Sequence, residues 1–195
     1  MRRKPSFAGL DTALPPELLD IARAVSAELR EQGVPHAIIG GLAVGAHGWA
    51  RMTRDIDVLV PSDVDLDELL VLGERASPLA LPETFVGRSA VRAGVEIDVM
   101  APAEGGAMEV LDDAIADAET VDGLPVLALG PLVLMKLVSG RARDDADIVE
   151  MLKASKDDID ETADDVASYL EQNSVGLLDD FDSLVAQATW ELHRK

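Results

Sequence analysis

The chain has 195 residues, with 37 acidic and 17 basic side chains and a formal net charge of −20. This length suits one domain of moderate size or a core with a helical appendage, and the absence of cysteine excludes a disulfide framework. The acidic charge disfavours broad binding to nucleic acid or to an anionic membrane. The N-terminus lacks an apolar signal region and no apolar run has the length of a transmembrane helix, so we expect a cytoplasmic protein without membrane contact.

Helices and strands are expected to alternate in the first part of the chain, whereas the last part is expected to be helical. Two prolines in the first turn and a closing Gly33 mark the first helix. Ser62 or Asp63 is a suitable N-cap for a later helix over 62–76. In chain order, we expect a helix over 15–32, a strand over 36–40, a helix over 42–50, a strand over 55–60, the helix over 62–76, a hairpin of strands over 83–91 and 94–100, a helix over 109–119, two short strands about Asp122–Gly123, and helices over 132–140, 144–155, 158–172 and 176–193.

This order predicts an α+β fold, in which a mixed β-sheet flanked by helices is followed by a C-terminal helical bundle. A boundary near residue 130 would divide the chain into a core with an N-terminal helix, residues 1–130, and a helical region, residues 131–195. The dense acidic residues after Asp157 are interpreted as solvated helix faces.

Three aspartates stand inside short apolar runs that predict strands: Asp55 and Asp57 in one run, and Asp98 in a later one. Side chains alternate across a strand, so Asp55 and Asp57 point to the same face. Carboxylates have little reason to lie in a half-buried strand unless a positive charge lies among them. Two carboxylates on one strand, with a third from another strand, form a set of oxygen ligands that suits Mg²⁺ together with substrate phosphates.

A glycine pair, Gly40–Gly41, ends one predicted strand and opens a helix. Because glycine has no Cβ, backbone N–H groups there can approach the phosphates of a nucleotide, and a helix N-terminus favours negative charge. The same pair would also serve as a plain tight turn. Lys136 is a single cation in an otherwise apolar helix, which could reach a phosphate or extend to solvent without a ligand.

These pieces, in this order, resemble the nucleotidyltransferase superfamily, which has the fold of DNA polymerase β. The signature of that superfamily is an apolar residue followed by Gly and then Gly or Ser, a spacer, and Asp-x-Asp between apolar residues. Ile39–Gly40–Gly41 and Asp55–Ile56–Asp57 match this signature here. The resemblance covers about residues 35–152 and implies a nucleotidyltransferase-like α+β core.

Residues 40–60 are similar to small bacterial nucleotidyltransferases of the AbiEii-type toxin group. In that group an Arg-x-Thr precedes the Asp-x-Asp, as Arg51 and Thr53 do here. The helical part of the group carries a lysine, an arginine and an Asp-x-x-Asp, and the matching residues here are Lys136, Arg141 or Arg143, Asp144 and Asp147.

The resemblance implies a Mg²⁺-dependent enzyme that moves an NMP group from an NTP to a hydroxyl or phosphate acceptor on tRNA, a protein or a small molecule. Two Mg²⁺ ions, roughly 3.5–4 Å apart, would align the acceptor with the leaving pyrophosphate. Asp55 and Asp57 would bridge both ions, while Asp98 would bind one of them or take the acceptor proton. The implied nucleotide contacts are Gly40, Gly41, Arg51, Thr53, Arg54 and Lys136, and the implied supporting residues are Arg143, Asp144 and Asp147.

Several of these residues have structural alternatives. Arg143, directly before the helix predicted over 144–155, is four residues from Asp147, and this spacing favours a surface ion pair or, alternatively, a brace between the helical region and the site. Arg51 and Arg54 would contact the triphosphate or balance the charge of the aspartates. His47 is a candidate general base or a structural residue. A local basic patch for RNA would combine Arg51, Arg54, Arg88, Arg92, Lys136 and Arg141.

Three functional hypotheses follow. The first is an active nucleotidyltransferase, which could be the toxin of a toxin–antitoxin pair with an antitoxin or another protein as its partner. The second is a catalytically inactive module of the same fold that binds nucleotide or a partner. The third, a metal-dependent phosphohydrolase, is disfavoured because the chain has only three histidines.

Overall fold

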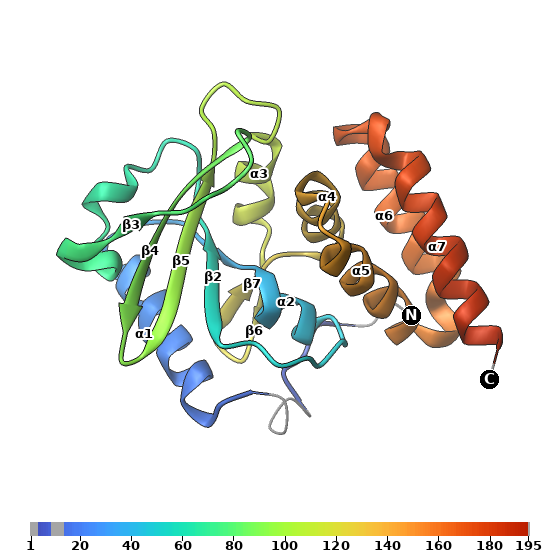
Figure 1. Cartoon of the computed structure of the whole chain (residues 1–195), viewed down its shortest axis with the longest axis horizontal. Coiled ribbons are helices and arrows are strands. Elements are labelled where there is room, and N and C mark those ends of the chain that lie inside the picture. Colours follow the sequence, from blue (N-terminus) through green and yellow to red (C-terminus); the bar gives the residue numbers. More distant parts are fainter. Residues whose placement is uncertain (1–3, 9–13, 195) are drawn as a thin grey trace.

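The computed structural model describes residues 4–8 and 14–194 of the chain. Its centre is a seven-stranded mixed sheet with the strand order β3-β4-β5-β2-β1-β7-β6 (Figure 1). β2 pairs with β5 and β1 pairs with β7 in parallel, and the other neighbours are antiparallel. The strands are β1 (Ala37–Ile38), β2 (Asp55–Leu59), β3 (Ser77–Pro78), β4 (Phe85–Arg92), β5 (Val95–Pro102), β6 (Glu119–Val121) and β7 (Leu124–Val126).

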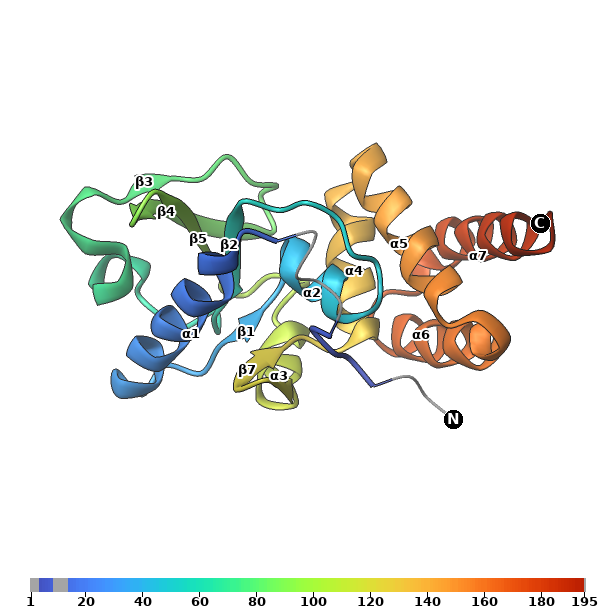
Figure 2. The same cartoon turned by 90° about the horizontal axis from the view of Figure 1, so that it is seen from below.

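Helices flank this sheet and continue beyond it, which confirms the predicted fold class. α1 and α3 lie on one side of the sheet, and α4 to α7 form a group beside it (Figures 1 and 2). Within that group, α5 packs against α7 and α4 packs against α6. The helices are α1 (Pro16–Glu31), α2 (Gly40–Ala46), α3 (Val110–Ala116), α4 (Leu129–Ser139), α5 (Ala142–Ala154), α6 (Ile159–Asn173) and α7 (Leu178–His193), with short 3₁₀ helices η1 (Leu66–Glu68), η2 (Leu70–Arg75), η3 (Lys156–Asp158) and η4 (Val175–Leu177).

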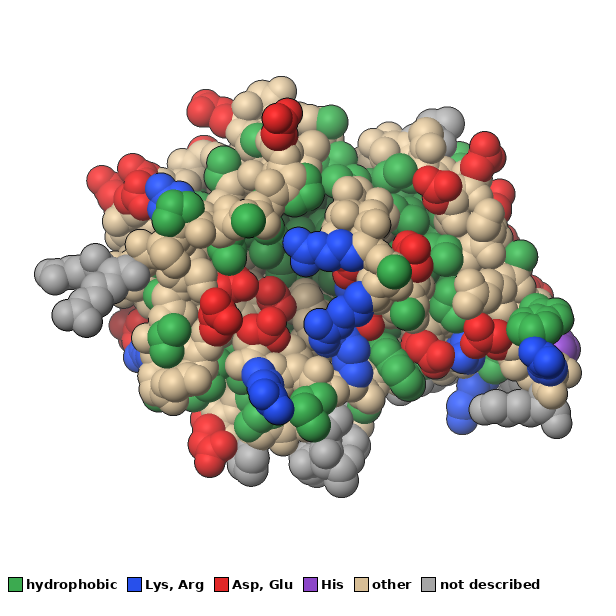
Figure 3. Space-filling model, viewed as in Figure 1, with side chains coloured by type: hydrophobic (Ala, Val, Ile, Leu, Met, Phe, Trp, Pro, Cys, Tyr) green, Lys and Arg blue, Asp and Glu red, His purple; other side chains and the backbone are tan. Residues whose placement is uncertain are grey.

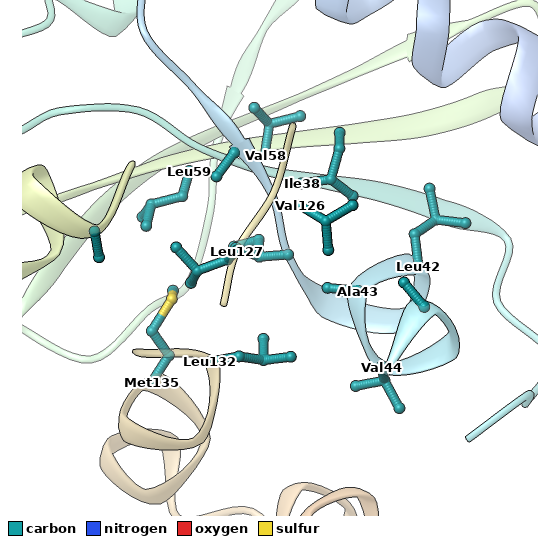
Figure 4. Close-up of a cluster of buried hydrophobic side chains, with 14 of the residues drawn as sticks. Ile38, Leu42, Ala43, Val44, Val58, Leu59, Val126, Leu127, Leu132 and Met135 are labelled. Carbon is teal, nitrogen blue, oxygen red and sulfur yellow. The ribbon is translucent and has the colours of Figure 1, made fainter. Parts of the chain in front are cut away.

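The hydrophobic core lies between the sheet and the helices. Ile56 and Val58 on β2 and Ile97 and Val99 on β5 are fully buried and share one face of the sheet. Full burial of such a side chain stabilises the fold by roughly 1.5–3 kcal/mol. Because side chains alternate along a strand, the residues next to these four on β2 and β5 point to the opposite face of the sheet. A second part of the core packs β1 and β7 against α2 and α4 and contains Ile38, Leu42, Val126, Leu127, Leu132 and Met135 (Figure 4).

The helix predicted over 62–76 is wrong. The chain there forms turns followed by η1 and η2, and Gly73 has a φ of 64° inside η2. A left-handed glycine interrupts a helical repeat, so the apolar residues of this segment reach the core without forming an α-helix. Ser62 does not cap a helix either, because its N–H and hydroxyl donate to Asp112 at 3.0 and 2.6 Å.

Most other predicted elements are present with shifted ends. The first helix, the hairpin, the two short strands about Asp122–Gly123 and the C-terminal helices are confirmed. α2 begins at Gly40, two residues before the predicted start, because the glycine pair forms its first turn. α4 begins at Leu129, next to the predicted boundary, and the division of the chain at residue 130 stays a prediction. None of the helices in the described ranges is long and apolar enough to cross a membrane.

Candidate active site

The structure brings the three aspartates to one face of the sheet. β2 and β5 run parallel, with Asp57 opposite Asp98 and Asp55 opposite Glu96. Paired residues on neighbouring strands point to the same face, so the four carboxylates lie on one side of the sheet. Figure 3 shows acidic side chains gathered in a hollow on this side of the molecule, with basic side chains beside them. Residues more than 40 positions apart in the chain thus form one acidic cluster.

Glu96 is the member of this cluster that sequence reasoning missed. It stands two residues before Asp98 on β5, and strand alternation places both on one face. Glu96 is exposed, and the Ser89 hydroxyl on β4 donates to it at 3.1 Å. The Glu-x-Asp spacing on the second strand repeats the Asp-x-Asp spacing on the first, and this was the signal that could have revealed it.

Burial and mutual repulsion perturb two of the carboxyl groups. Burial, followed by the charges of the neighbouring aspartates, raises the pKa of Asp57 from 3.8 to about 7, against the effect of a hydrogen bond from the Gly41 N–H. Burial also raises the pKa of Asp98, with smaller increases from nearby carboxylates, while the Ser89 hydroxyl opposes this shift. Carboxylates that crowd together in a partly buried place favour a bound proton or a bound cation.

Asp98 has one oxygen without a hydrogen bond. Its Oδ1 atom is buried and has no partner within residues 4–8 and 14–194. Buried polar atoms are normally paired, so this oxygen fits a ligand that supplies positive charge or a proton. The donor set of carboxylate oxygens is the one that Mg²⁺ uses together with substrate phosphates. The described residues do not, by themselves, arrange three or more His, Asp or Glu side chains as a ready-made metal cage.

Neighbouring groups hold Asp55 and Asp57 in place. The Thr53 hydroxyl donates to the Asp55 carboxylate, and the Gly41 N–H donates to the Asp57 carboxylate. Gly40 has a φ of 57°, and a Cβ on this residue would overlap the Asp57 carboxylate. A Cβ on Gly41 would lie only 2.6 Å from Thr53 Cβ. Both glycines are therefore required for the close approach between this turn and the two aspartates.

A buried ion network ties the helical region to the loop that precedes β2. Asp147 on α5 is 1% exposed and accepts from Arg51 Nε and Nη2 at 2.8 and 3.0 Å. Lys136 Nζ on α4 donates to Asp147 at 2.7 Å and to Asp144 at 2.8 Å. Asp144 also accepts from the Ser139 hydroxyl at 2.7 Å. The network therefore fixes Lys136 with respect to both helices and the loop.

The ion pair predicted between Arg143 and Asp147 is wrong. Arg51 and Lys136 occupy both carboxylate oxygens of Asp147, and Arg143 is exposed. Asp147 faces inward rather than along the outer face of α5, so its arginine partner comes from a loop 96 residues earlier in the chain. Local helical spacing carries no information about a partner at that separation.

The basic patch predicted for RNA is smaller than expected. Arg88 and Arg92 form ion pairs with Asp67 and Glu28, at 2.7 and 2.5 Å, so their charges are locally neutralised. Arg54 is exposed beside the start of β2. Arg51 and Lys136 belong to the buried network described above, which leaves Arg54 and the exposed Arg141 from the predicted set.

A cleft of about 130 Å³ opens beside Asp57. Gly40, Lys136, Arg141 and Asp144 also line this cleft. Asp57 of the acidic cluster, Gly40 of the glycine turn and two cations therefore line one concave cleft, which is the usual form of a small-ligand site. The remaining wall is mostly apolar and consists of Ile39, Leu81, Pro82, Phe85, Met100, Leu132, Met135 and Ser139.

His47 lies away from this cleft, in the lining of a larger cavity of about 240 Å³ at the start of α4. The two cavities share none of their lining residues. His47 is buried, and its Nε2 atom lies 2.8 Å from the carbonyl oxygen of Leu127. This contact anchors the ring to the backbone, which supports the structural interpretation of His47 over a role as general base at the aspartates.

No protein-family model and no curated protein matches this chain. Among solved structures, it is similar to a proposed nucleotidyltransferase from Thermotoga maritima, with 18% identity, a TM-score of 0.49, and coverage of 68% of this chain and 91% of that chain. A proposed nucleotidyltransferase from H. pylori has 13% identity and a TM-score of 0.45, with coverage of 92% and 96%.

A CCA-adding enzyme from Thermotoga maritima, solved with tRNA, has 16% identity and a TM-score of 0.41. That similarity covers 90% of this chain but only 48% of the enzyme. Similarities at these identities and TM-scores do not define an activity.

Proposed function

We propose that the protein is a Mg²⁺-dependent nucleotidyltransferase, which transfers an NMP group from an NTP to a hydroxyl or phosphate acceptor. The observation that carries this proposal is the placement of Asp57 opposite Asp98, with Asp55 on the same face, beside the Gly40–Gly41 turn. Asp57 and Lys136 both line the adjoining cleft, so a carboxylate of the cluster and a cation suited to phosphate meet at one place. The sequence resemblance supports the same conclusion independently of the cleft.

Asp55, Asp57 and Asp98 would hold the metal. The raised pKa of Asp57 and the unpaired Oδ1 of Asp98 both fit a set of carboxylates that is stabilised by a bound cation. When bound, Mg²⁺ lowers the pKa of an attacking hydroxyl and neutralises charge on phosphate oxygens. Asp98 Oδ1 would complete this ligand set or accept the proton of the acceptor hydroxyl, and both roles use the same atom.

Lys136 and Arg141 would bind the triphosphate. Lys136 Nζ donates two of its three N–H groups to Asp144 and Asp147, at 2.8 and 2.7 Å, and its side chain lines the cleft together with Gly40, so one N–H group is left for a phosphate oxygen. A fixed ammonium group costs little reorganisation when a phosphate binds, which is the advantage of a preorganised site. Arg141 is exposed at the same cleft and offers a planar donor group for phosphate oxygens.

Arg51 and Thr53 would act indirectly. Both were expected to contact the nucleotide, but Arg51 is engaged by Asp147 and Thr53 by Asp55. Arg51 would therefore support Lys136 through their shared partner, Asp147. Asp144 and Asp147 keep their expected supporting role, whereas the exposed Arg143 has no part in the network.

The narrower form of this proposal concerns the acceptor and the biological role. The resemblance to AbiEii-type proteins supports a toxin that is controlled by an antitoxin in a bacterial cytoplasm, and it supports a tRNA acceptor. The charge of −20 supports a protein or small-molecule acceptor instead. Labelling of tRNA, of protein and of small hydroxyl compounds from an α-labelled NTP would separate these acceptors.

Binding of a non-hydrolysable NTP with Mg²⁺, measured by isothermal titration, tests the proposal. Wild-type protein should bind, and Asp55→Asn and Asp57→Asn should each weaken binding by at least tenfold because a ligand charge is lost. Asp160→Asn is the matched control, since Asp160 is exposed on α6. The proposal is contradicted if wild type does not bind, or if Asp55→Asn binds and turns over NTP as wild type does.

The inactive-module hypothesis makes a different prediction from the same experiment. A module that binds nucleotide should do so without release of pyrophosphate under any acceptor condition, and a module that binds only a partner should release none either. An active enzyme requires pyrophosphate release that falls with Asp98→Asn. Pyrophosphate detection therefore distinguishes the two hypotheses once binding has been established.

A further inference from the structure

Thr53 lies where it can contact Asp55 but not a nucleotide. It is 3% exposed and stands two residues before Asp55, at the entry to β2. Its hydroxyl donates to Asp55 Oδ1. The one polar group of this side chain is therefore used inside the protein, directly behind a proposed metal ligand.

Thr53 also packs against the glycine turn. A Cβ on Gly41 would lie 2.6 Å from Thr53 Cβ and 3.2 Å from Thr53 Cγ2, so the bare backbone of Gly41 leaves the space that Thr53 fills. The Gly41 N–H in turn donates to Asp57. Thr53 thus touches one aspartate directly and contacts the residue that holds the other.

The segment that carries Thr53 is fixed at a second point. Arg51, two residues earlier, forms two hydrogen bonds to Asp147, at 2.8 and 3.0 Å. The short connection from Arg51 to Asp55 is therefore anchored on α5 at one end and on the glycine turn at the other. A side chain in such a segment has little freedom to move, which suits a group that orients another.

We propose that Thr53 is a positioning residue that holds Asp55 in the orientation needed for the metal, an inference that rests on the proposed function. A hydroxyl bound to Oδ1 restrains the rotation of the carboxylate and leaves Oδ2 for the cation. Groups that orient a metal ligand in this way typically contribute about 10–100-fold to metal affinity or activity. The buried hydroxyl of Thr53, rather than a contact with nucleotide, accounts for the Arg-x-Thr that precedes the two aspartates.

Titration of the full-length protein with Mn²⁺ alone, in the absence of nucleotide, tests this role. Thr53→Val keeps the shape of the side chain and removes the hydroxyl, so it should weaken Mn²⁺ binding by about 10-fold or more. Thr53→Ser restores the hydroxyl and should bind Mn²⁺ within about threefold of wild type. Thr120→Val is the matched control, because Thr120 is exposed on β6, at the far edge of the sheet. Melting temperatures of all variants report whether the fold itself has changed.

A second readout separates positioning from binding of the nucleotide. Loss of the hydroxyl should lower kcat at saturating NTP and metal, while the KM for NTP changes by less than threefold. The inference is overturned if Thr53→Val binds Mn²⁺ as wild type does, or if Thr53→Ser is as weak as Thr53→Val. If wild type and Asp55→Asn bind Mn²⁺ equally, the proposed function itself fails and the role of Thr53 fails with it. If wild type binds Mn²⁺, Asp55→Asn does not, and Thr53→Val binds as wild type does, only the role of Thr53 is refuted.

Discussion

Replacement of Asp147 by alanine should destabilise the protein more than the loss of any exposed carboxylate. Asp147 is 1% exposed and balances two cations: Arg51, through two hydrogen bonds, and Lys136, through one. Removal of one partner from a buried ion pair leaves an uncompensated charge and typically costs about 3–5 kcal/mol. Lys136 keeps Asp144 at 2.8 Å, whereas Arg51 forms no second ion pair in the described part of the chain and otherwise acts only through its charge on Asp57.

The expected loss is therefore near the lower end of that range, about 3 kcal/mol, and most of it comes from Arg51. For a chain of this size, such a loss should lower the melting temperature by roughly 6–12 °C. Urea unfolding followed by circular dichroism measures the free energy directly. Asp182→Ala is the matched control, because Asp182 is exposed on α7.

The double variant Asp147→Ala/Arg51→Met provides the decisive comparison. It removes both members of the main pair, so it should be more stable than Asp147→Ala alone despite carrying a second substitution. A loss below about 1 kcal/mol for Asp147→Ala would show that water or movement of the loop compensates Arg51, and Arg51 would then have no part in fixing Lys136 through Asp147.

Three further predictions concern the carboxylate cluster. Gly40→Ala should abolish NTP binding and destabilise the fold, because its Cβ would overlap Asp57; Gly33→Ala shares a positive φ but meets nothing within 4 Å, so it should cost only about 1–2 kcal/mol. The pKa of Asp57 is raised from 3.8 to about 7, so the folded state binds the extra proton and the free energy of unfolding should fall as the pH rises from 4 to 7. Urea unfolding at pH 5 and pH 8 should show this loss in wild type and a smaller one in Asp57→Asn. Addition of Mg²⁺ at pH 8 should raise the melting temperature of wild type and have no effect on Asp55→Asn, and removal of Mg²⁺ with a chelator should reverse the increase.

The fold could be predicted where a local pattern determines the local structure. Alternating apolar residues defined β2 and β5, and the positive φ values of Ala93 and Gly94 are those of the tight turn that the sequence indicated between β4 and β5. The segment 62–76 could not be predicted in the same way. Its apolar residues have a spacing that suits a helix, but the conformation depends on Gly73 and on the contact between Ser62 and Asp112, a residue 50 positions away.

The candidate site, too, could be predicted where it depends on a local pattern and not where it depends on contacts between distant segments. Asp55, Asp57 and Asp98 could be selected because carboxylates in apolar strands are unusual, and period-two alternation placed the first two together. The register that sets Asp57 opposite Asp98 could not be derived, because it depends on the pairing of strands that are far apart in the sequence. The partner of Asp147 was missed for the same reason, since i, i+4 spacing describes only one helix.

The exposed arginines of the loop before β2 and of the start of α5 limit how strongly this face of the protein can bind a nucleic-acid acceptor. Arg54, Arg141 and Arg143 are exposed and have no acidic partner among the described residues, whereas Arg88 and Arg92 are neutralised by ion pairs. Contact with three phosphates of a single strand would give a slope of roughly −2 in a plot of log affinity against log salt. Filter binding of tRNA between about 50 and 200 mM salt measures this slope, with Arg54→Ala expected to reduce it by about 0.7. A slope steeper than about −4 would require a basic surface that these arginines do not supply.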